Sequence, residues 1–282
     1  MEDADTGGSG WFAGLDPGDS AAAAEAIRNG SADEPRAWPA LAVDAGFAAD
    51  ESEYYERLRE ATIEAAEEAV HEREGADDQQ LIHAVRALDD CERVRNELTE
   101  RVGEWAGSRD ADAGVDMAYV RELAAREPTD PVERRLVSLA TRLVDLERES
   151  RSLRTLVEGT AQSVAPNLTA LAGPELAARL VALAGGLAEL AKKPAGTVQV
   201  LGAEDALFAH LRGGAPSPKH GVIYTHEYVR GTHPEDRGSA ARALAGKLAI
   251  AARIDNYAGD YRPELERELD DRIERIRARD HA

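Results

Sequence analysis

Four histidines and a lysine lie close together in the second half of the chain and are the residues best suited to chemistry. His210, His220, His226 and His233 fall within 24 residues, and Lys219 directly precedes the second of them. Imidazoles can hold a transition metal, but no cysteine lies near these, no His-x3-His pair occurs, and the surrounding acids fit no familiar ligand spacing. We therefore expect neither a metal site nor a cofactor.

The segment 202–229, GAEDALFAHLRGGAPSPKHGVIYTHEYV, instead presents cationic and hydrogen-bonding groups on a stiff loop. Two prolines restrict the backbone before Lys219, and a glycine pair frees the entry to the loop. Lysine and arginine neutralise phosphate, and histidine stacks on or bonds to an exposed base. Lys219 and His220, together with Arg242 and Arg253, therefore indicate RNA binding. The alternative is a stiff loop that caps a small domain and carries a solvated lysine.

Enzymatic motifs are missing from the sequence. It contains no GxSxG, no P-loop and no GxGxxG after a strand. Cys91 falls in an apolar helical repeat, where a core position is the simpler interpretation than a nucleophile. As the single cysteine it can form no internal disulfide, which fits a reducing cytoplasm. We expect a soluble, cytoplasmic protein that is no enzyme, with no run long and apolar enough to span a membrane.

Charge is distributed unevenly along the 282 residues. Residues 1–158 hold 18 Arg, no Lys and 38 Asp/Glu, a net of −20, whereas residues 159–282 hold the remaining 16 Lys/Arg and 16 Asp/Glu, a net of 0. The total of −20 would argue against a nucleic-acid partner. Scarce lysine and abundant acid indicate a surface adapted to high salt, and against it the second part is relatively basic.

Helical periodicity dominates the elements that would position these residues. Helices are predicted over 51–74, 77–106 and 117–126, and a long one begins near Pro131, which suits a first helical turn. Apolar residues in the last of these recur at steps of three and four, with one step of seven across Ser150, as in a coiled coil: Val132, Leu136, Leu139, Leu143, Leu146, Leu153 and Val157. The two long helices predict an antiparallel coiled-coil hairpin, for which a purely scaffolding role is the alternative to self-association.

The flanking regions differ in character. Residues 1–50 are rich in Gly, Ala, Asp and Pro and predict a short α/β piece that buries little by itself. Residues 159–260 are poor in charge and predict a packed, all-helical domain. Its late helix, from about Ser239 to Tyr257, places Arg242 and Arg253 on one face. Residues 261–282 predict a separate charged helix.

Two segments resemble a known family. GAEDALFAHLRGGAPSPKHGVIYTHEYV is similar to the Nop-domain pattern GAEKALFxHLxxGxxPPKHGxIxxHP, and RGSAARALAGKLAIAARIDNYAG resembles the downstream segment of the same domain. The order of an N-terminal region, a coiled coil and this domain also matches. The chain resembles the archaeal Nop-domain proteins of box C/D small ribonucleoproteins, and its acidic composition is haloarchaeal-like.

This resemblance implies a fold, a function and partners. The fold would be mainly α, and the boundaries would fall at 1–50, a shortened fibrillarin-docking region; 51–158, a linker and hairpin; 159–260, the Nop domain; and 261–282. The protein would be a non-catalytic scaffold that bridges a kink-turn guide RNA, with its small ribosomal-type binding protein, to the 2′-O-methyltransferase fibrillarin, for ribose methylation of rRNA or tRNA. A homodimer would form through Leu81, Val85, Leu88, Leu136, Leu139, Leu143 and Leu146.

The resemblance also assigns RNA-contacting residues: Gly202, Ala203, Glu204, Lys219, His220, Gly221, Arg242, Lys247 and Arg253. Lys247 lies about 140° around the helix from Arg242, which favours a role toward the core or a loop. Leu207, Phe208 and Leu211 are expected to pack the domain, with Phe208 near the protein partner. Asp205, Ser217 and Glu227 depart from the family pattern, the region before the hairpin is short, and a mixed-charge helix follows the domain where the family commonly has a basic tail.

Two alternatives remain from the sequence. One is a spliceosome-type Nop-domain assembly protein with the same fold, which the acidic, archaeon-like composition disfavours. The other is a coiled-coil interaction protein without RNA binding.

Overall fold

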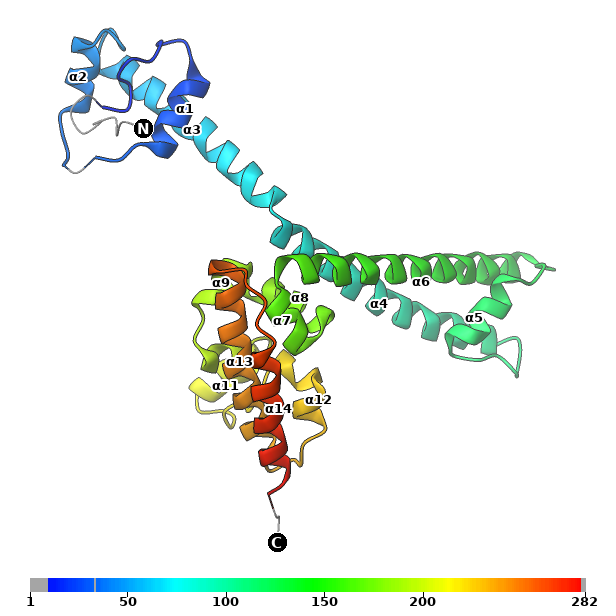
Figure 1. Ribbon diagram of the computed structural model, residues 1–282. Coiled ribbons are helices and arrows are strands. Elements are labelled where there is room, and N and C mark those ends of the chain that lie inside the picture. The colour runs from blue at the N-terminus through cyan, green and yellow to red at the C-terminus, as the bar shows by residue number, and fades with distance from the viewer. Residues whose placement is uncertain (1–9, 33, 280–282) are drawn as a thin grey trace. The chain divides into compact units, whose positions relative to one another are not determined.

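Helices account for all regular structure in the part of the chain that the computed structural model describes, residues 10–32 and 34–279 (Figure 1). The chain divides into two units, residues 1–76 and 77–282. The expectation of a mainly α protein is therefore confirmed. The ends of the predicted segments 1–50 and 261–282 lie outside the described residues.

The first unit is built of α1 (Ser20–Asn29), α2 (Trp38–Asp44) and α3 (Glu51–Gly75). Its core is aromatic: Phe12 and Phe47 stack with ring centroids 5.7 Å apart, and Tyr54 of α3 meets Phe12 edge-on. Arg28 of α1 also forms ion pairs with two glutamates of α3. The helix predicted over 51–74 thus completes the core of this unit rather than belonging to the hairpin.

The predicted α/β character of residues 1–50 was wrong for the part that is described, which contains no strand. The apolar residues around Leu41, which could have formed a strand, lie in α2. A proline in the first turn and a run of alanine and leucine favour a helix there.

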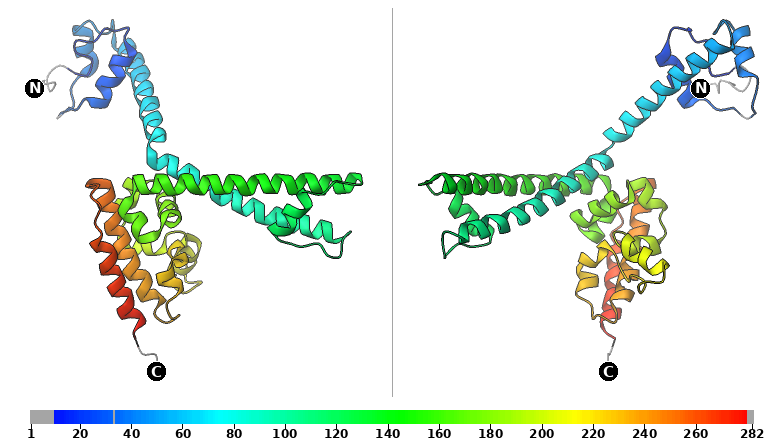
Figure 2. Two further views of the ribbon diagram at one scale, coloured as in Figure 1. Left: turned by 45° about the vertical axis from the view of Figure 1, so that its right-hand side comes forward. Right: turned by 180° about the vertical axis from the view of Figure 1, so that it is seen from behind.

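The second unit begins with a hairpin of α4 (Asp77–Gly107) and α6 (Pro131–Val164), with α5 (Met117–Ala124) between them at the far end (Figures 1 and 2). Asp130 caps α6 by accepting hydrogen bonds from the N–H groups of Val132 and Glu133. Val120 and Leu123 of α5 are buried against both long helices. The far end is therefore a three-helix cluster rather than a two-stranded seam.

The rest of the second unit is a helical domain packed on the hairpin base. Its elements are α7 (Pro166–Ala172), α8 (Pro174–Ala184), α9 (Leu187–Lys192), α10 (Ala195–Val200), α11 (Glu204–Leu211), the 3-10 helix η1 (Val222–Thr225), α12 (Glu227–Arg230), α13 (Arg237–Tyr257) and α14 (Glu264–Arg277). Pro166 and Pro174 stand in the first turns of α7 and α8, where the fixed φ of proline suits a helix. Alanine and leucine of α13 occupy the centre of the core, with Ala241, Leu244 and Leu248 at most 1% exposed.

The C-terminal helix α14 is an integral part of this domain. It lies alongside α13 (Figures 1 and 2), and its Leu265, Leu269, Ile273 and Ile276 join the same core. Arg277 donates to the backbone oxygen of Glu227 at 2.8 Å. The separate charged helix expected from the sequence is therefore amphipathic and docked.

Two further findings concern what the described residues lack. None of their helices is both long and apolar enough to cross a membrane. Nor do they contain a cluster of three or more His, Cys, Asp or Glu side chains that could hold a metal ion.

Candidate nucleic-acid interface

The loop that carries Lys219 and His220 is held by backbone pairing with the end of α10. Gly221 N donates to Gln199 O at 2.8 Å, and Val222 N donates to Leu201 O at 2.7 Å. The Gln199 side chain donates to the carbonyl oxygen of Lys219 at 2.7 Å. Three hydrogen bonds thus fix the backbone on both sides of His220 and orient the loop without help from the two side chains.

Glycine is required at two positions of this pairing. A Cβ atom on Gly221 would lie 1.9 Å from Leu201 O, which no side chain can tolerate. Gly202 has a φ of +79°, in the left-handed region that glycine occupies freely. Gly202 and Gly221 therefore shape the loop through their lack of side chains, and both lie at the same hollow beside Val222.

His220 is partly covered by its own domain. Its ring stacks on Tyr224 with centroids 4.5 Å apart and an interplanar angle of 21°. The Arg237 guanidinium lies over the same tyrosine, 5.6 Å from the ring centroid. Burial, aided by Arg237 and Lys219, lowers the pKa of His220. The imidazole is therefore held neutral, as a stacking and hydrogen-bonding group rather than a cation.

Lys219 is the exposed cation of the loop. Its side chain passes the start of α13, 4.0 Å from where a Cβ of Gly238 would lie. It lines a surface hollow together with Gln199, Leu207 and Arg242. Neither Lys219 nor Arg242 makes an ion pair with a residue in the described ranges. The structure thus brings together two cations that lie 23 residues apart in sequence (242 − 219).

Ala203 and Glu204 begin α11. Ala203 is its N-cap residue, and the Glu204 carboxylate accepts a hydrogen bond from Gly202 N at 2.8 Å. This contact closes the turn that enters the helix and places a negative charge at its N-terminus. Glu204 therefore acts on the loop's conformation, and a carboxylate offers no attraction for phosphate.

The apolar face of α11 was expected in the core but is exposed. No residue of this helix is buried, and Phe208 and Leu211 are 57% and 70% exposed. The prediction that these two side chains pack the domain was wrong. An amphipathic pattern shows that a face is apolar without showing that its own chain covers it.

The other two predicted cations of α13 have structural partners. Lys247 forms an ion pair with Glu268 of α14, as its angular separation from Arg242 suggested. Arg253 donates to the carbonyl oxygens of Ala191 at 3.1 Å and Lys193 at 3.3 Å, at the end of α9. Arg253 is about 16 Å along the helix from Arg242 (11 residues at 1.5 Å). It caps a neighbouring helix and does not join the Lys219–Arg242 pair.

Five of the seven leucine and valine residues assigned to self-association are buried inside one chain. Leu81, Val85 and Leu88 are at most 1% exposed and pack against Val157 and Ala161. Leu136 and Leu143 lie in the cluster with α5, and Leu139 packs against it, half-buried. The five buried residues form the hairpin's own core, so they present no surface to a second copy. The spacing of apolar residues in a sequence is the same whether a helix of the same chain or of a second copy packs against them.

The histidine cluster of the sequence is dispersed in the structure. His210 Nδ1 contacts the carbonyl oxygen of Ala215 at 2.9 Å, inside the loop. His226 is the N-cap residue of α12 and accepts a hydrogen bond from Tyr228 N at 3.1 Å. Burial lowers the pKa of His226, which keeps that acceptor unprotonated. Each of these side chains thus has a local role in the backbone.

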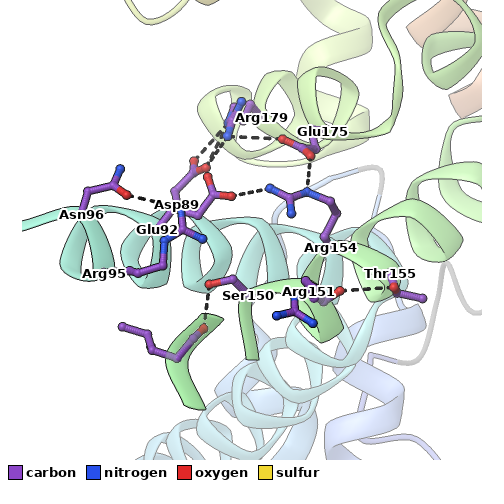
Figure 3. A network of polar contacts seen from close by, with 11 residues as sticks. Asp89, Glu92, Arg95, Asn96, Ser150, Arg151, Arg154, Thr155, Glu175 and Arg179 are labelled. Carbon is purple, nitrogen blue, oxygen red and sulfur yellow. Dashed lines mark hydrogen bonds and ion pairs between the residues drawn. The ribbon is translucent and has the colours of Figure 1, made fainter. Parts of the chain in front are cut away.

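A charged network that the sequence analysis did not identify joins the hairpin to the domain. Figure 3 shows Arg179 of α8 directed at Asp89 of α4, with a bidentate contact in which Nη2 lies 2.5 Å from Oδ1. Arg154 of α6 donates to Glu175 at 2.7 Å and also bonds Glu92. Three helices thus share one network beside Gly202 and Gly221, since Asp89 and Arg179 line the same hollow as the two glycines.

A half-buried aspartate likewise fixes the start of the domain. Asp255, on α13, accepts hydrogen bonds from the backbone N–H groups of Asn167 at 3.0 Å and Leu168 at 2.8 Å. Asn167 in turn accepts from Arg262 N at 2.7 Å. The segment IDNYAG therefore supplies a cap for α7, a role that the sequence pattern alone does not reveal.

Comparison with known proteins agrees with this architecture. Residues 76–276 match the family described as "Nop: snoRNA binding domain, fibrillarin". An uncharacterised NOP5 family protein of Methanocaldococcus jannaschii is 52% identical over 143 residues, which cover 50% of this chain and 34% of that protein. Nucleolar protein 58 of Schizosaccharomyces pombe is 32% identical over 215 residues, covering 63% of this chain and 42% of its own.

A solved structure shows the same fold. The crystal structure of a fibrillarin/Nop5p complex contains a chain with a TM-score of 0.53 and 24% identity, covering 95% of this chain and 99% of that one. The all-helical domain with its projecting hairpin is thus a fold that a known protein shares. The chain belongs to the Nop family of snoRNA-binding-domain proteins. It spans less than half the length of the two curated relatives.

Proposed function

We propose that this protein is the scaffold subunit of a box C/D guide ribonucleoprotein and contributes no catalytic group. The observation that carries the proposal is the pair of neighbouring cations, Lys219 and Arg242, beside a loop whose backbone is fixed by three hydrogen bonds. A rigid backbone places a cation for phosphate without a further loss of backbone conformational entropy. Membership of a family with a snoRNA-binding domain supplies the class of ligand.

The chemistry of the loop suits a folded RNA such as a kink-turn. Lys219 is exposed and suited to phosphate, and the neutral His220 can bond to a base or a 2′-hydroxyl at its free edge. Arg242 extends the cationic surface onto α13. Glu204 and Arg253 serve the fold instead, so we assign RNA contact to Lys219, His220 and Arg242.

The exposed apolar face of α11 supports a protein partner beside the RNA. Phe208 and Leu211 are exposed on α11, which begins just after Gly202. The loop that carries Lys219 follows this helix directly. A composite surface of apolar and cationic groups would recognise an RNA that already carries its small ribosomal-type protein. A few well-packed side chains at the centre of such an interface contribute most of the binding free energy.

The first unit is the proposed fibrillarin-docking region. It has its own aromatic core, and an apolar hollow of about 460 Å³ opens beside Trp11, Ile27, Trp38 and Leu58. A stable core makes such a surface available without prior folding on a partner. The protein would thereby position another protein's S-adenosylmethionine-dependent active site on a guide-selected rRNA or tRNA ribose.

Self-association through the hairpin is a further part of the proposal. Because the inward leucines are used within the chain, a dimer would have to form through exposed hairpin residues such as Leu98, Trp105 and Leu156. Sedimentation of the isolated protein measures this directly, and a monomer at all concentrations would exclude it.

Electrophoretic shift of a kink-turn RNA tests the proposed function. The RNA is incubated with the full protein, with and without the small kink-turn-binding protein, at high salt. We expect a further shift only when both proteins are present. No shift with both components would contradict the RNA-scaffold proposal and favour an interaction protein without an RNA role. Size measurement with fibrillarin added tests the docking role of the first unit.

A further inference from the structure

A second cationic hollow lies between α13 and α14, and the sequence suggested no RNA role for α14. It has a volume of about 460 Å³, and four cationic side chains line it: Arg242, Lys247, Arg272 and Arg279. No acidic side chain is among the described residues that line it. In a chain with a net charge of −20, this is an exceptional concentration of positive charge.

Two carboxylates beside this hollow form ion pairs with cations that line it. Lys247 forms an ion pair with Glu268, which lies one helical turn before Arg272. Arg279 forms an ion pair with the mostly buried Asp236 at 2.8 Å. Arg242 and Arg272 make no ion pair with a described residue, and both are exposed. Two cations therefore remain uncompensated and accessible.

The floor of the hollow is low and open. Gly246 lies one turn after Arg242 on α13, and a Cβ atom added there would meet no atom within 4 Å. Ser239 adds a hydroxyl at the rim. Because Gly246 has no side chain, a polyanion can approach the surface of α13 closely between the cations. A larger side chain at this position would block that approach.

The hollow is continuous with the loop described above. Arg242 lines both it and the hollow that contains Lys219. A cationic track thus runs from Lys219 over Arg242 to Arg272. Free inorganic phosphate or an isolated carboxylate would occupy one point of such a track, whereas a polynucleotide backbone presents regularly spaced charges along its whole length.

We propose that the α13–α14 hollow binds the phosphate backbone of the same RNA, with Arg242 and Arg272 as the contacting residues. This inference rests on the proposed function and extends it to α14. Lys247 and Arg279 act as positioning residues, because each holds a carboxylate away from the two accessible arginines.

The test compares two arginines of the same helix. Arg272→Gln removes a charge from the hollow, and Arg275→Gln removes one about 60° further around α14, where Arg275 lines a different hollow with Asp271 and Glu274. Gly246→Glu fills the hollow with a carboxylate and improves helix propensity, so the fold is kept. Affinity for a kink-turn RNA carrying its small protein is measured over a series of KCl concentrations.

We expect Arg272→Gln and Gly246→Glu to weaken binding several-fold, with Arg275→Gln unchanged. The slope of log Kd against log [KCl] should fall by about 0.7–0.9 in Arg272→Gln, because one phosphate is no longer neutralised by the protein. Wild-type affinity and slope in both hollow variants, with Lys219→Ala still impaired, would overturn this inference and leave the proposed function intact. Failure of the unmodified protein to bind would overturn both. Weaker binding of the small protein without RNA would assign the hollow to protein instead.

Discussion

The backbone of Gly221 lies directly against Leu201, so close that a methyl group on the glycine would be 1.9 Å from the leucine carbonyl oxygen. That contact is where the loop of Lys219 and His220 meets the end of α10. Its two hydrogen bonds, at 2.7 and 2.8 Å, leave the loop no room to move inward. The position of the cation is thus fixed by the backbone of another helix end.

Gly221→Ala should therefore destabilise the domain and displace the loop. Because the clash is with a carbonyl group, the backbone must shift, and we expect a cost of about 1–3 kcal/mol in the free energy of unfolding. Gly246→Ala is the matched control, since its added methyl group meets open space inside a helix and should be neutral or stabilising by about 0.5–1 kcal/mol. Denaturant unfolding of both variants measures the difference. Equal stabilities would show that the pairing is loose.

Protonation of His226 should weaken the domain in mild acid. Burial lowers its pKa in the folded state below 6.5, so the unfolded chain binds the proton more readily. The free energy of unfolding therefore falls as the pH drops through 6.5 toward the folded pKa, and is unaffected above about pH 7. Unfolding measured between pH 7.5 and 5.5 reports the change.

His226→Asn provides the control for this pH dependence. Asparagine can accept the same hydrogen bond from Tyr228 N at the helix N-cap but does not titrate. The slope of stability against pH in this window should be smaller than in the unmodified protein. The remainder should come from His220, whose pKa burial also lowers. An unchanged slope would remove His226 from the account.

Ionisation of Tyr228 should lower the free energy of unfolding at alkaline pH. Burial and its hydrogen bond to Asp270 raise the pKa of Tyr228 from 10.0 to about 12. The stabilisation is fully present below pH 10 and is lost as the pH rises toward 12. Tyr228→Phe should cost about 1–3 kcal/mol at pH 8, because Asp270 loses a donor. It should also flatten the stability profile above pH 10, and a profile as steep as that of the unmodified protein would contradict the assignment.

The network between hairpin and domain should show measurable coupling. Arg179→Ala and Asp89→Ala each break the bidentate contact between α8 and α4. Because both side chains are partly exposed, water screens the pair, and a double-mutant cycle should give a coupling of about 1 kcal/mol. High salt should reduce it. Arg142→Ala and Asp145→Ala, an exposed pair on α6 at 3.7 Å, serve as the control cycle and should couple less.

The helices of this protein follow closely from local sequence. Pro131 begins α6 where it was expected to, proline also begins α7 and α8, and the spacing of leucine predicts which face of α6 is apolar. What local sequence does not contain is the partner of each face. Leu136 and Leu143 pack within the chain, whereas Phe208 and Leu211, with a similar pattern, face solvent.

The candidate site was predictable to the same degree. Lys219 and Arg242 were expected to act together, and they line one hollow. Arg253 was assigned to the same face, yet its guanidinium donates hydrogen bonds to carbonyl oxygens at the end of α9. Only the tertiary fold brings these oxygens near it. Arg272 received no assignment, because its role depends on α14 docking against α13. Periodicity identifies a helix face, and long-range packing decides its use.

Equilibrium binding of Lys219→Ala to a kink-turn RNA that carries its small protein tests the central claim most directly. Arg142→Ala, on the 80% exposed side chain of a hairpin arginine, is the matched loss of one positive charge. We expect several-fold weaker binding and a shallower salt dependence for Lys219→Ala only, with unfolding unchanged in both variants. Wild-type binding by Lys219→Ala, or equal weakening by the two variants, would contradict the claim that this loop is the RNA-recognition element.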